Sequence, residues 1–414
     1  MATDEPLTIF SYAGPNKSTC GYCSPPGQRS RDKTSHTIGL WPSQLSCPAY
    51  QKMIDRGWRR SGEYLYKPDM RASCCPQYTI KLDTLVFTPS KSMRKIVNRW
   101  NRYVLHGDAD DQDSTGSSSS QADTPPFDLT TAIHASEHAF LNGASASASA
   151  KHKFEIALEA STYTQEKFEL YKTYQKSVHN DDDNTQEGFE RFLVESPLQE
   201  QLIPYAAHAR RPTHLPATYG SYHMTYRLDG TLIAFSVLDI LPGCVSSVYF
   251  VYRPEVGLER FSMGKLSALH EATMAKEIHA AGVRSLKSLY LGFYVHSCAK
   301  MRYKGEYAPS YLLDPETYQW FPLEEWRPLL ETWHYASIAK PEMNVMAPTE
   351  SVREPYVSEQ TLESVRVVSA VRGNSIIVRS LPKSKLWSPA ASQAGMRATV
   401  AGLGPELAAS VIFQ

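Results

Sequence analysis

The middle of the chain alternates apolar and polar positions, and this pattern predicts a run of β-strands. Two such stretches, 222–228 and 231–241, meet at Asp229-Gly230. An Asp-Gly pair between alternating runs is typical of a two-residue hairpin turn. Pro242-Gly243 then turns the chain into a third predicted strand, 244–252. We therefore expect three consecutive antiparallel strands.

The apolar positions then change to helical spacing. This spacing predicts a helix from about 262 to 281, closed by Gly282 and followed by a fourth strand at 288–294. A strand, a long helix and a strand form a right-handed crossover between neighbouring parallel strands. Joined to the preceding hairpin, this crossover predicts a mixed sheet of the acetyltransferase-like (GNAT) type.

A half-buried strand is predicted upstream, where Phe154, Ile156 and Leu158 alternate with charged or small residues. Thr162 and Gln165 then form a capping-box pattern at the start of a helix. Both elements extend the predicted second domain towards its amino terminus.

A segment rich in Ser, Asp, Ala and Gln, residues 107–149, interrupts these patterns. It holds too little apolar area to offset the entropy of ordering it, so we expect an acidic, disordered linker. The predicted domains are a Cys-rich, basic amino-terminal module (1–106), this linker, an acetyltransferase-like domain (150–345) and a weakly patterned tail (346–414). The tail contains one plausible hairpin, 364–371 with 375–380. The expected fold class is α+β, with a small Cys-rich metal module beside a mixed β-sheet domain with helices.

No apolar run among the 414 residues approaches the ~20 residues of a membrane span, and the acidic amino terminus shows no secretory signal. We expect a soluble protein of the cytoplasm, or also of the nucleus, with no membrane partner.

The net charge of zero hides two opposite segments. Residues 52–102 carry twelve Lys and Arg against four Asp and Glu, whereas 104–150 carry seven acidic residues and no Lys or Arg. Trp58, Tyr64, Tyr66 and Trp100 lie among the cations. Aromatic and basic side chains together suit stacking on unpaired bases and neutralisation of phosphates, so this segment predicts an RNA-binding surface. A solvated basic face is the alternative.

Four of the seven cysteines occur in two close pairs, Cys20-Gly-Tyr-Cys23 and Cys74-Cys75. Two such pairs can complete a four-thiolate metal site. The alternative is that the four cysteines are small buried side chains that bind no metal. Adjacent cysteines are awkward for one zinc ion, whereas an iron–sulfur cluster offers them two irons. Zinc and a cluster therefore both stay open, with Cys47 and His36 as spare ligands.

Several longer motifs carry a family resemblance. Together with the two cysteine pairs, the segments 219–227, 239–250, 290–304 and 307–313 resemble the eukaryotic arginyl-tRNA–protein transferases. The resemblance covers roughly 8–105 and 150–335, and leaves the linker and the tail unmatched. It implies arginyl-tRNA as co-substrate and transfer of arginine to proteins that begin with Asp, Glu or oxidised Cys, which marks them for ubiquitin-dependent degradation. It also implies a cysteine module that binds zinc or an iron–sulfur cluster.

Those substrates suggest three kinds of site residue. The acidic acceptor needs cations, for which we expect Lys300, Arg302 and Lys304, since an extended segment would place all three on one face; Arg227 is weaker. The donor guanidinium needs carboxylates, for which the candidates are Asp239 and Glu271, with Glu306 behind. The attacking amine needs a hydrogen-bonding partner, and the catalytic candidates are His223 and His296, although either could be a satisfied core histidine.

Two other functions compete with this interpretation. A coenzyme A-dependent acetyltransferase would carry a glycine-rich pyrophosphate loop before the crossover helix, but Met263 and Lys265 stand where small residues are needed. We therefore expect no coenzyme A. A non-enzymatic RNA-binding metalloprotein would explain the basic module and leave the strand motifs of the second domain unexplained.

Overall fold

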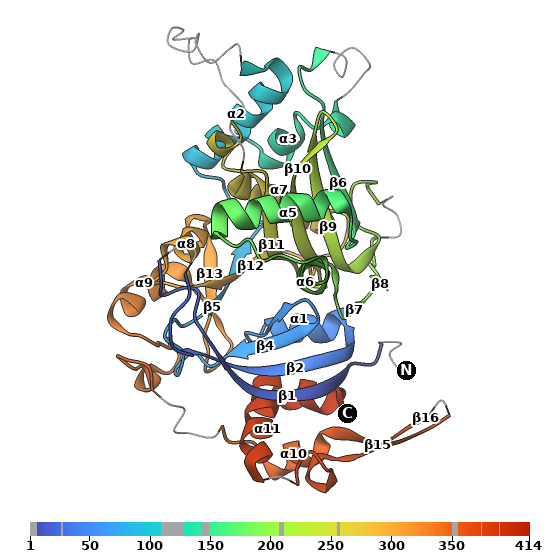
Figure 1. Cartoon of the computed structure of the whole chain (residues 1–414), viewed down its shortest axis with the longest axis vertical. Helices are drawn as coiled ribbons and strands as arrows, with labels where there is room; N and C mark the ends of the chain where they lie inside the picture. Colours follow the sequence, from blue (N-terminus) through green and yellow to red (C-terminus); the bar gives the residue numbers. More distant parts are fainter. Residues whose placement is uncertain are drawn as a thin grey trace.

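The structure is a computed structural model of the 414-residue chain. It describes residues 6–25, 28–108, 127–141, 149–206, 211–254, 257–349, 355–373, 375–388 and 390–414. Among these residues the strands form two mixed sheets, with helices packed on both (Figure 1). No helix in the described ranges is both long and apolar enough to cross a bilayer.

The larger sheet has nine strands. Their order is β14 (Trp320–Pro322), β13 (Ser310–Leu313), β5 (Tyr78–Asp83), β12 (Ser288–Tyr294), β11 (Cys244–Tyr252), β10 (Thr231–Ile240), β9 (Thr218–Leu228) and β6 (Phe154–Ala160), with β8 (Gln201–Leu202) paired to β9. Strands β9, β10 and β11 are successively antiparallel. The predicted hairpin is confirmed, and its turn residues Asp229 and Gly230 have φ values of 51° and 81°, the left-handed backbone that a tight hairpin turn of this kind requires.

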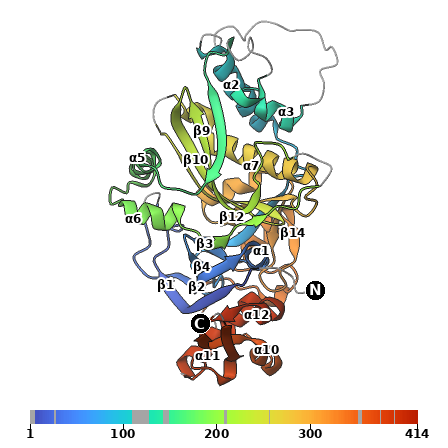
Figure 2. The same cartoon turned by 90° about the vertical axis from the view of Figure 1, so that its right-hand side faces the viewer.

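The crossover is also confirmed. Helix α7 (Met263–Ala280) connects β11 to β12, and these two strands pair in parallel. Helices α5 (Gln165–Tyr174) and α7 cover opposite faces of the larger sheet (Figures 1 and 2). Leu266, Leu269 and Ile278 of α7 are fully buried, so one face of this helix is part of the main core.

The smaller sheet joins the two ends of the chain. Its order is β16 (Ser375–Ser380), β15 (Arg366–Arg372), β17 (Ile412–Phe413), β1 (Ile9–Ser18), β2 (Ser35–Ser46), β4 (Tyr64–Pro68) and β3 (Arg59–Ser61), with β7 (Leu198–Gln199) paired to β2. Strand β17 pairs in parallel with both β1 and β15, which brings the amino- and carboxyl-terminal segments side by side (Figure 1). The predicted tail hairpin is present as β15 and β16.

The remaining helices are α1 (Cys47–Ile54), α2 (Lys91–His106), α3 (Leu129–His134), α6 (Gln186–Phe189), α8 (Ala299–Arg302), α9 (Leu323–Thr332), α10 (Glu359–Ser364), α11 (Ala390–Leu403) and α12 (Pro405–Ser410). Helices α11 and α12 supply Met396, Val400, Leu403 and Leu407 to the main core, next to the smaller sheet (Figure 2). The tail is thus packed against the amino-terminal strands.

The pairing of strands does not follow the predicted domain boundary at residue 106. Strand β5 belongs to the amino-terminal segment in sequence, yet it lies between β12 and β13 of the larger sheet. Within the predicted linker, 109–126 and 142–148 lie outside the described residues. Residues 127–141 differ from the prediction, because α3 is helical and its Ile133 is buried in the main core. The four-part division stays a prediction about units that fold independently.

Candidate functional site

The four predicted cysteines come together in one group. Cys20 and Cys23 follow β1, Cys74 and Cys75 precede β5, and their four Sγ atoms all lie within 4.8 Å of one another. Cys20 and Cys75 are 3% exposed, and the Sγ atoms of Cys23 and Cys74 are 3.7 Å apart. Tetrahedral zinc with Zn–S bonds of about 2.3 Å separates its sulfurs by about 3.8 Å. The group therefore fits a bound metal.

Polar hydrogens approach two of these sulfurs. The backbone N–H of Tyr22 donates to Sγ of Cys20 at 3.3 Å, and the hydroxyl of Thr34 donates to Sγ of Cys74 at 3.0 Å. Burial raises the pKa of the Cys20 thiol, but hydrogen bonds from the amides of Tyr22 and Cys23 and from neighbouring thiols more than offset this, so the net pKa is lowered. Burial raises the pKa of the Cys74 thiol to about 11 and also raises that of Cys75, so a bound metal would have to displace the protons of these two thiols.

A cavity of about 330 Å³ lies beside β11 and α7 in the larger sheet. The segment after β12 covers one side of it, and the end of α5 with the π-helical turn Gln175–His179 covers another. Six aromatic side chains line it: Tyr174, Tyr249, Phe250, Tyr252, Tyr303 and Tyr307. Such a volume accommodates a side chain the size of arginine or a nucleoside fragment.

Glu271 is the acidic group of this cavity. It lies on α7 and is 1% exposed. Its Oε1 accepts hydrogen bonds from Ser267 at 2.8 Å and from Ser236 at 3.0 Å, whereas its Oε2 is buried with no hydrogen-bond partner in the described part of the chain. Burial raises the pKa of Glu271, because a carboxylate loses its hydration there. A buried carboxylate oxygen beside a cavity is suited to a cationic ligand.

Lys300 and Lys304 also line the cavity, on the segment that follows β12. The expectation that this segment is extended is wrong, because α8 and a 3₁₀ turn (Tyr303–Glu306) make it helical. Positions four apart share a helix face, so Lys300 and Lys304 lie together and Arg302, which is exposed, does not line the cavity.

Lys304 has an unusual environment for an ammonium group. Its Nζ donates to the backbone oxygen of Phe293 at 3.0 Å. Burial, and secondarily the positive charge of Arg59, lower the pKa of Lys304 to about 7. An anionic ligand in the cavity would favour the charged form of this lysine.

Asp239 lies elsewhere and is already paired. Both of its oxygens accept hydrogen bonds at 2.8 Å from Arg60, and Oδ1 also accepts from Ser221 at 2.7 Å. The side chains of Arg60 and Asp239 are 1% and 0% exposed. The pair connects β3 of the smaller sheet to β10 of the larger one, so we leave Asp239 out of the donor site. Glu306 pairs with Lys265 at 2.6 Å on the surface.

His223 is fully buried and satisfied on both ring nitrogens. Its Nε2 lies 2.9 Å from the backbone oxygen of Leu193, and its Nδ1 lies 3.0 Å from Nζ of Lys167. These partners assign the neutral Nε2–H tautomer, which donates to Leu193 and accepts from Lys167. Burial and the charge of Lys167 lower the pKa of His223 to about 4. The geometry is that of a structural histidine.

The other two predicted site residues also lie outside the cavity lining. His296 is half-buried after β12, where its Nδ1 lies 3.0 Å from the hydroxyl of Tyr294. Arg227 forms an ion pair with Glu166 on the surface and donates to the oxygen of Gly230. The structure therefore brings together Glu271, Lys300 and Lys304 of the predicted substrate and catalytic residues.

The basic segment is split between core and surface. Trp58 and Trp100 are 0% and 1% exposed, so neither can stack on a base, contrary to the expectation. Their positions are set by packing: Trp100 contacts Phe154 and Phe261, and Nε1 of Trp58 donates to the oxygen of Gly402. Most of the exposed cations lie instead on the outer face of α2, at Lys91, Lys95 and Arg99, while Lys52 is exposed on α1 and pairs with Glu406.

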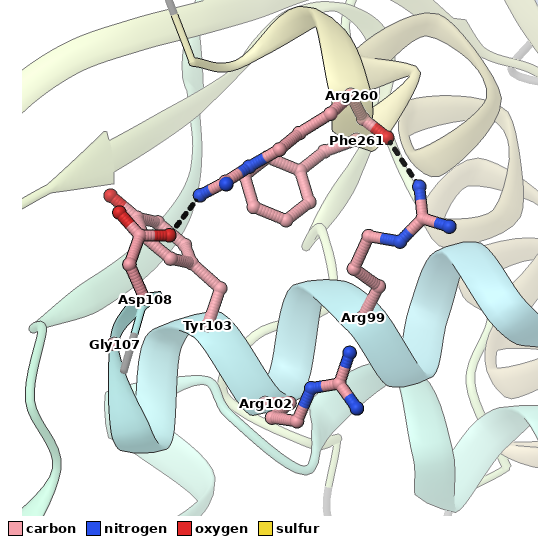
Figure 3. A pocket seen from close by; sticks show the side chains of 7 residues that line it. All are labelled: Arg99, Arg102, Tyr103, Gly107, Asp108, Arg260 and Phe261. Atoms are coloured by element: carbon pink, nitrogen blue, oxygen red, sulfur yellow. Dashed lines mark hydrogen bonds and ion pairs between the residues drawn. The ribbon is translucent and has the colours of Figure 1, made fainter. Parts of the chain in front are cut away.

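A small polar pocket lies at the end of this face (Figure 3). Arg99 and Arg102 of α2 approach it from one side, and Arg260 of the turn before α7 from the other. Arg99 donates to the backbone oxygen of Arg260 at 3.0 Å, and Arg260 pairs with Asp108. Three guanidinium groups around one hollow are suited to phosphate oxygens.

Comparison with protein families gives two matches. The family model described as "Arginine-tRNA-protein transferase, N terminus" matches residues 18–95, and the one described as "Arginine-tRNA-protein transferase, C terminus" matches 166–314. The first range contains all four clustered cysteines, and the second contains Glu271, Lys300 and Lys304. The cysteine group and the three charged residues of the cavity thus lie within the matched segments, whereas Arg99 and Arg102 of the arginine pocket lie outside them.

The chain is also similar to individual proteins. An arginyl-tRNA–protein transferase 1 of Drosophila melanogaster is 33% identical to it, over 77% of this chain and 83% of the fly protein. An aspartate/glutamate leucyltransferase of Pseudomonas syringae is 25% identical, over 74% of this chain and 95% of that protein. Among solved structures, the carboxyl-terminal domain of a lysylphosphatidylglycerol synthetase from Agrobacterium fabrum covers 53% of this chain at 12% identity, with a TM-score of 0.25, too low to assign a fold.

Proposed function

Because this chain belongs to the arginyl-tRNA–protein transferase family and is an aminoacyltransferase, we propose that it transfers arginine in the cavity beside α7. The proposed acceptors are proteins whose first residue is Asp or Glu, or oxidised Cys, and the products enter ubiquitin-dependent degradation. One observation carries the proposal: the cavity has a buried carboxylate, Glu271, and two lysines, Lys300 and Lys304. The donor is a cation and the acceptor is an anion, so each would find its complement there.

The donor arginine is placed at Glu271. A guanidinium could donate to the unpartnered Oε2 of this carboxylate, and the two serine hydroxyls on Oε1 would hold the group in position. Arginine then removes the cost of a buried oxygen without a partner. Surrounding aromatic rings would pack on the methylene stem and on the guanidinium plane.

The acceptor carboxylate is placed at Lys300 and Lys304. Lys304 is half-buried with its Nζ held by the backbone oxygen of Phe293, so it presents a positioned donor. Lys300 is exposed and would meet the acceptor at the entrance. Arg302 is left out because it does not line the cavity.

The reaction needs alignment more than it needs a nucleophilic side chain. The neutral α-amine of the acceptor attacks the ester carbonyl of arginyl-tRNA, the new C–N amide bond forms, and the ester C–O bond breaks. The amine loses one proton and the released ribose oxygen gains one, so the atoms balance. An aminoacyl ester is already activated, and holding two reactants together can lower the barrier by roughly 7–11 kcal/mol.

The larger sheet is proposed to be of the acetyltransferase-like (GNAT) type. Its support is the antiparallel series β9–β10–β11 followed by the α7 crossover to a parallel β12. In this arrangement the reactants meet beside β11 and the start of the crossover helix, which is where the cavity lies.

The exposed cations of α2 and the arginine pocket of Figure 3 are proposed to bind tRNA phosphates. Replacing Lys91, Lys95 and Arg99 together by Ala should weaken binding of different tRNAs alike, and should reduce the slope of log affinity against log salt by roughly two to three. A charge-matched triple, Lys340, Lys383 and Lys385 to Ala, is the control. Equal slopes in the two variants would assign α2 to the solvated surface.

The cysteine group is proposed to hold zinc or an iron–sulfur cluster through Cys20, Cys23, Cys74 and Cys75. The spacing of the sulfurs supports a single tetrahedral ion, and the adjacent Cys74 and Cys75 are compatible with a cluster. Its packing against Cys298 and Met301, the latter also a cavity residue, would let bound metal brace the segment that carries the lysines. Anaerobic purification with metal and labile-sulfide analysis separates the two.

The function itself is tested by following labelled amino acids from charged tRNA to short peptides. We expect transfer of arginine to Asp- and Glu-initiated peptides, little transfer to an Ala-initiated peptide, and little transfer of leucine. Transfer of an acetyl group from coenzyme A, or tRNA binding without any transfer, would instead support one of the two competing functions. We further propose a cytoplasmic or nuclear location, which a tagged chain imaged in cells would test.

A further inference from the structure

A second group of side chains that could hold a metal ion lies away from the cysteine group and the cavity. It consists of His134 on α3, His214 in the loop before β9, and Glu277 on α7. One ligand atom from each residue lies within 4.8 Å of the others. The three residues come from segments that are far apart in sequence, and all three are half-buried.

Two of the separations, each to a different oxygen of Glu277, are close to the edge length of a tetrahedral site. Nε2 of His134 lies 3.2 Å from Oε1 of Glu277, and Nε2 of His214 lies 3.3 Å from Oε2 of the same carboxylate. With bonds of about 2.0–2.1 Å to nitrogen and oxygen, ligand atoms around tetrahedral zinc stand about 3.3 Å apart.

The environment of His214 points to a missing ligand. Its Nε2 is buried and has no aligned hydrogen-bond partner among the described residues, although a carboxylate oxygen is only 3.3 Å away. The contact is close but poorly aligned, which is the relation expected of a ring nitrogen and a carboxylate oxygen that both face a shared ion. An ordinary His–Glu pair would align the N–H with the oxygen.

His134 is held as metal-bound histidines are held. Its Nδ1 lies 2.8 Å from Oε1 of Glu137, whose side chain is 5% exposed. A carboxylate on Nδ1 fixes the ring, and Nε2, which is hydrogen-bonded to Oε1 of Glu277 at 3.2 Å, would exchange this contact for the ion and serve as the ligand. The group thus has ligands and also a carboxylate that orients one of them.

We propose that His134, His214 and Glu277 form a zinc site. Two imidazoles and one carboxylate are a ligand set that zinc accepts, with water in the fourth position. The site joins α3 to α7, two helices that lie far apart in sequence. Glu137 also lies 3.3 Å from Nδ1 of His270, the neighbour of Glu271, so the bound ion would help to hold α7 where it borders the cavity.

The proposal predicts one zinc ion per chain that does not depend on the cysteines. In the full chain, purified without chelators, His214→Gln should lose about one zinc per chain and leave iron, labile sulfide and thiolate-bound metal unchanged. His279→Gln, two residues from Glu277 on the same helix, is the matched control and should retain the wild-type zinc content. Equal zinc in wild type and His214→Gln would contradict the site, and would identify the group as a network of ion pairs.

A measurement on the unaltered chain guards against a variant that fails to fold. X-ray absorption at the zinc edge should show nitrogen or oxygen neighbours at about 2.0–2.1 Å, besides any sulfur neighbours at about 2.3 Å. Zinc with sulfur neighbours alone, or a chain that contains no zinc, would overturn the proposal. Neither result would bear on arginine transfer, which is assayed separately.

Discussion

Asp239 and Glu271 are two carboxylates in almost the same state of burial, 0% and 1% exposed, with opposite surroundings. Asp239 receives two hydrogen bonds from Arg60 and one from Ser221, which leaves it no room for a substrate. Glu271 lines a cavity, accepts aligned hydrogen bonds from Ser236 and Ser267 on Oε1, and has a buried Oε2 with no aligned partner among the described residues. Burial alone does not distinguish a structural carboxylate from a binding one; the inventory of partners does.

The largest effect on stability is expected from breaking the buried ion pair between Arg60 and Asp239. Asp239→Ala leaves the guanidinium of Arg60 buried without its partner, which typically costs about 3–5 kcal/mol of unfolding free energy. Chemical denaturation measures this loss. Glu271→Gln is the matched variant and should change the unfolding free energy by less than about 1 kcal/mol, because it removes a buried charge that lacks a partner. If the two variants are equally destabilised, Asp239 and Glu271 do not differ in how far their partners stabilise the fold.

A pH titration of stability sharpens the contrast for His223, another buried group whose partners are complete. Its folded-state pKa is about 4, against about 6.5 when unfolded. Below pH 6.5 the histidine is protonated in the unfolded chain and stays neutral in the folded chain, so the unfolding free energy falls as the pH drops from 6.5 to 4. The total loss is about 3 kcal/mol. His223→Gln should lose this part of the pH dependence. If the slope of unfolding free energy against pH is the same in wild type and His223→Gln, His223 binds its proton equally well in the folded and the unfolded chain.

The open site should respond through its lysines. Lys304→Met keeps the apolar stem and removes the charge, so it should lower kcat/KM for Asp-initiated peptides about ten- to a hundredfold, the equivalent of one lost charge-assisted hydrogen bond. The affinity for arginyl-tRNA should change much less, because a different reactant is held there. Arg302→Met, outside the cavity, should cost much less. If Arg302→Met were the more damaging change, the acceptor site would lie outside the cavity.

The smallest effect is expected at an ion pair that resembles Arg60–Asp239 in chemistry but not in burial. Arg227 and Glu166 have side chains 36% and 43% exposed. Water solvates both partners when the pair is broken, so Arg227→Ala should cost less than about 1 kcal/mol of unfolding free energy. The same denaturation experiment measures it, and a loss near that of Asp239→Ala would mean that burial does not set the strength of these pairs.

Local patterns predicted much of the fold. The Asp229-Gly230 turn, the α7 crossover and the β15–β16 hairpin each depend on residues that are close in sequence, and all three are present. The placements of β5 and β17 could not be predicted, because their strand partners lie far away along the chain. The segment after β12 was expected to stay extended, since periodicity in a strand does not show where the strand ends.

The sequence predicted several residues of the candidate sites, but it could not predict which side chains would contact one another. The cysteines could be found because their spacing is itself a signal. Asp239 and Glu271 could not be ranked from sequence, since the partner of Asp239 is Arg60, 179 residues earlier. The group of His134, His214 and Glu277 carries no sequence signal, because each residue is isolated and His134 and Glu277 lie 143 residues apart.

The central claim is that Glu271 recognises the charge of the donor arginine, and a neutral isostere tests it most directly. Transfer to an Asp-initiated peptide would be measured with tRNA carrying arginine and with tRNA carrying citrulline, which has the same shape without the charge. The wild-type chain should prefer arginine by about ten- to a hundredfold in kcat/KM, and Glu271→Gln should reduce the preference to near unity. A preference that Glu271→Gln leaves unchanged would contradict the account and place the guanidinium elsewhere.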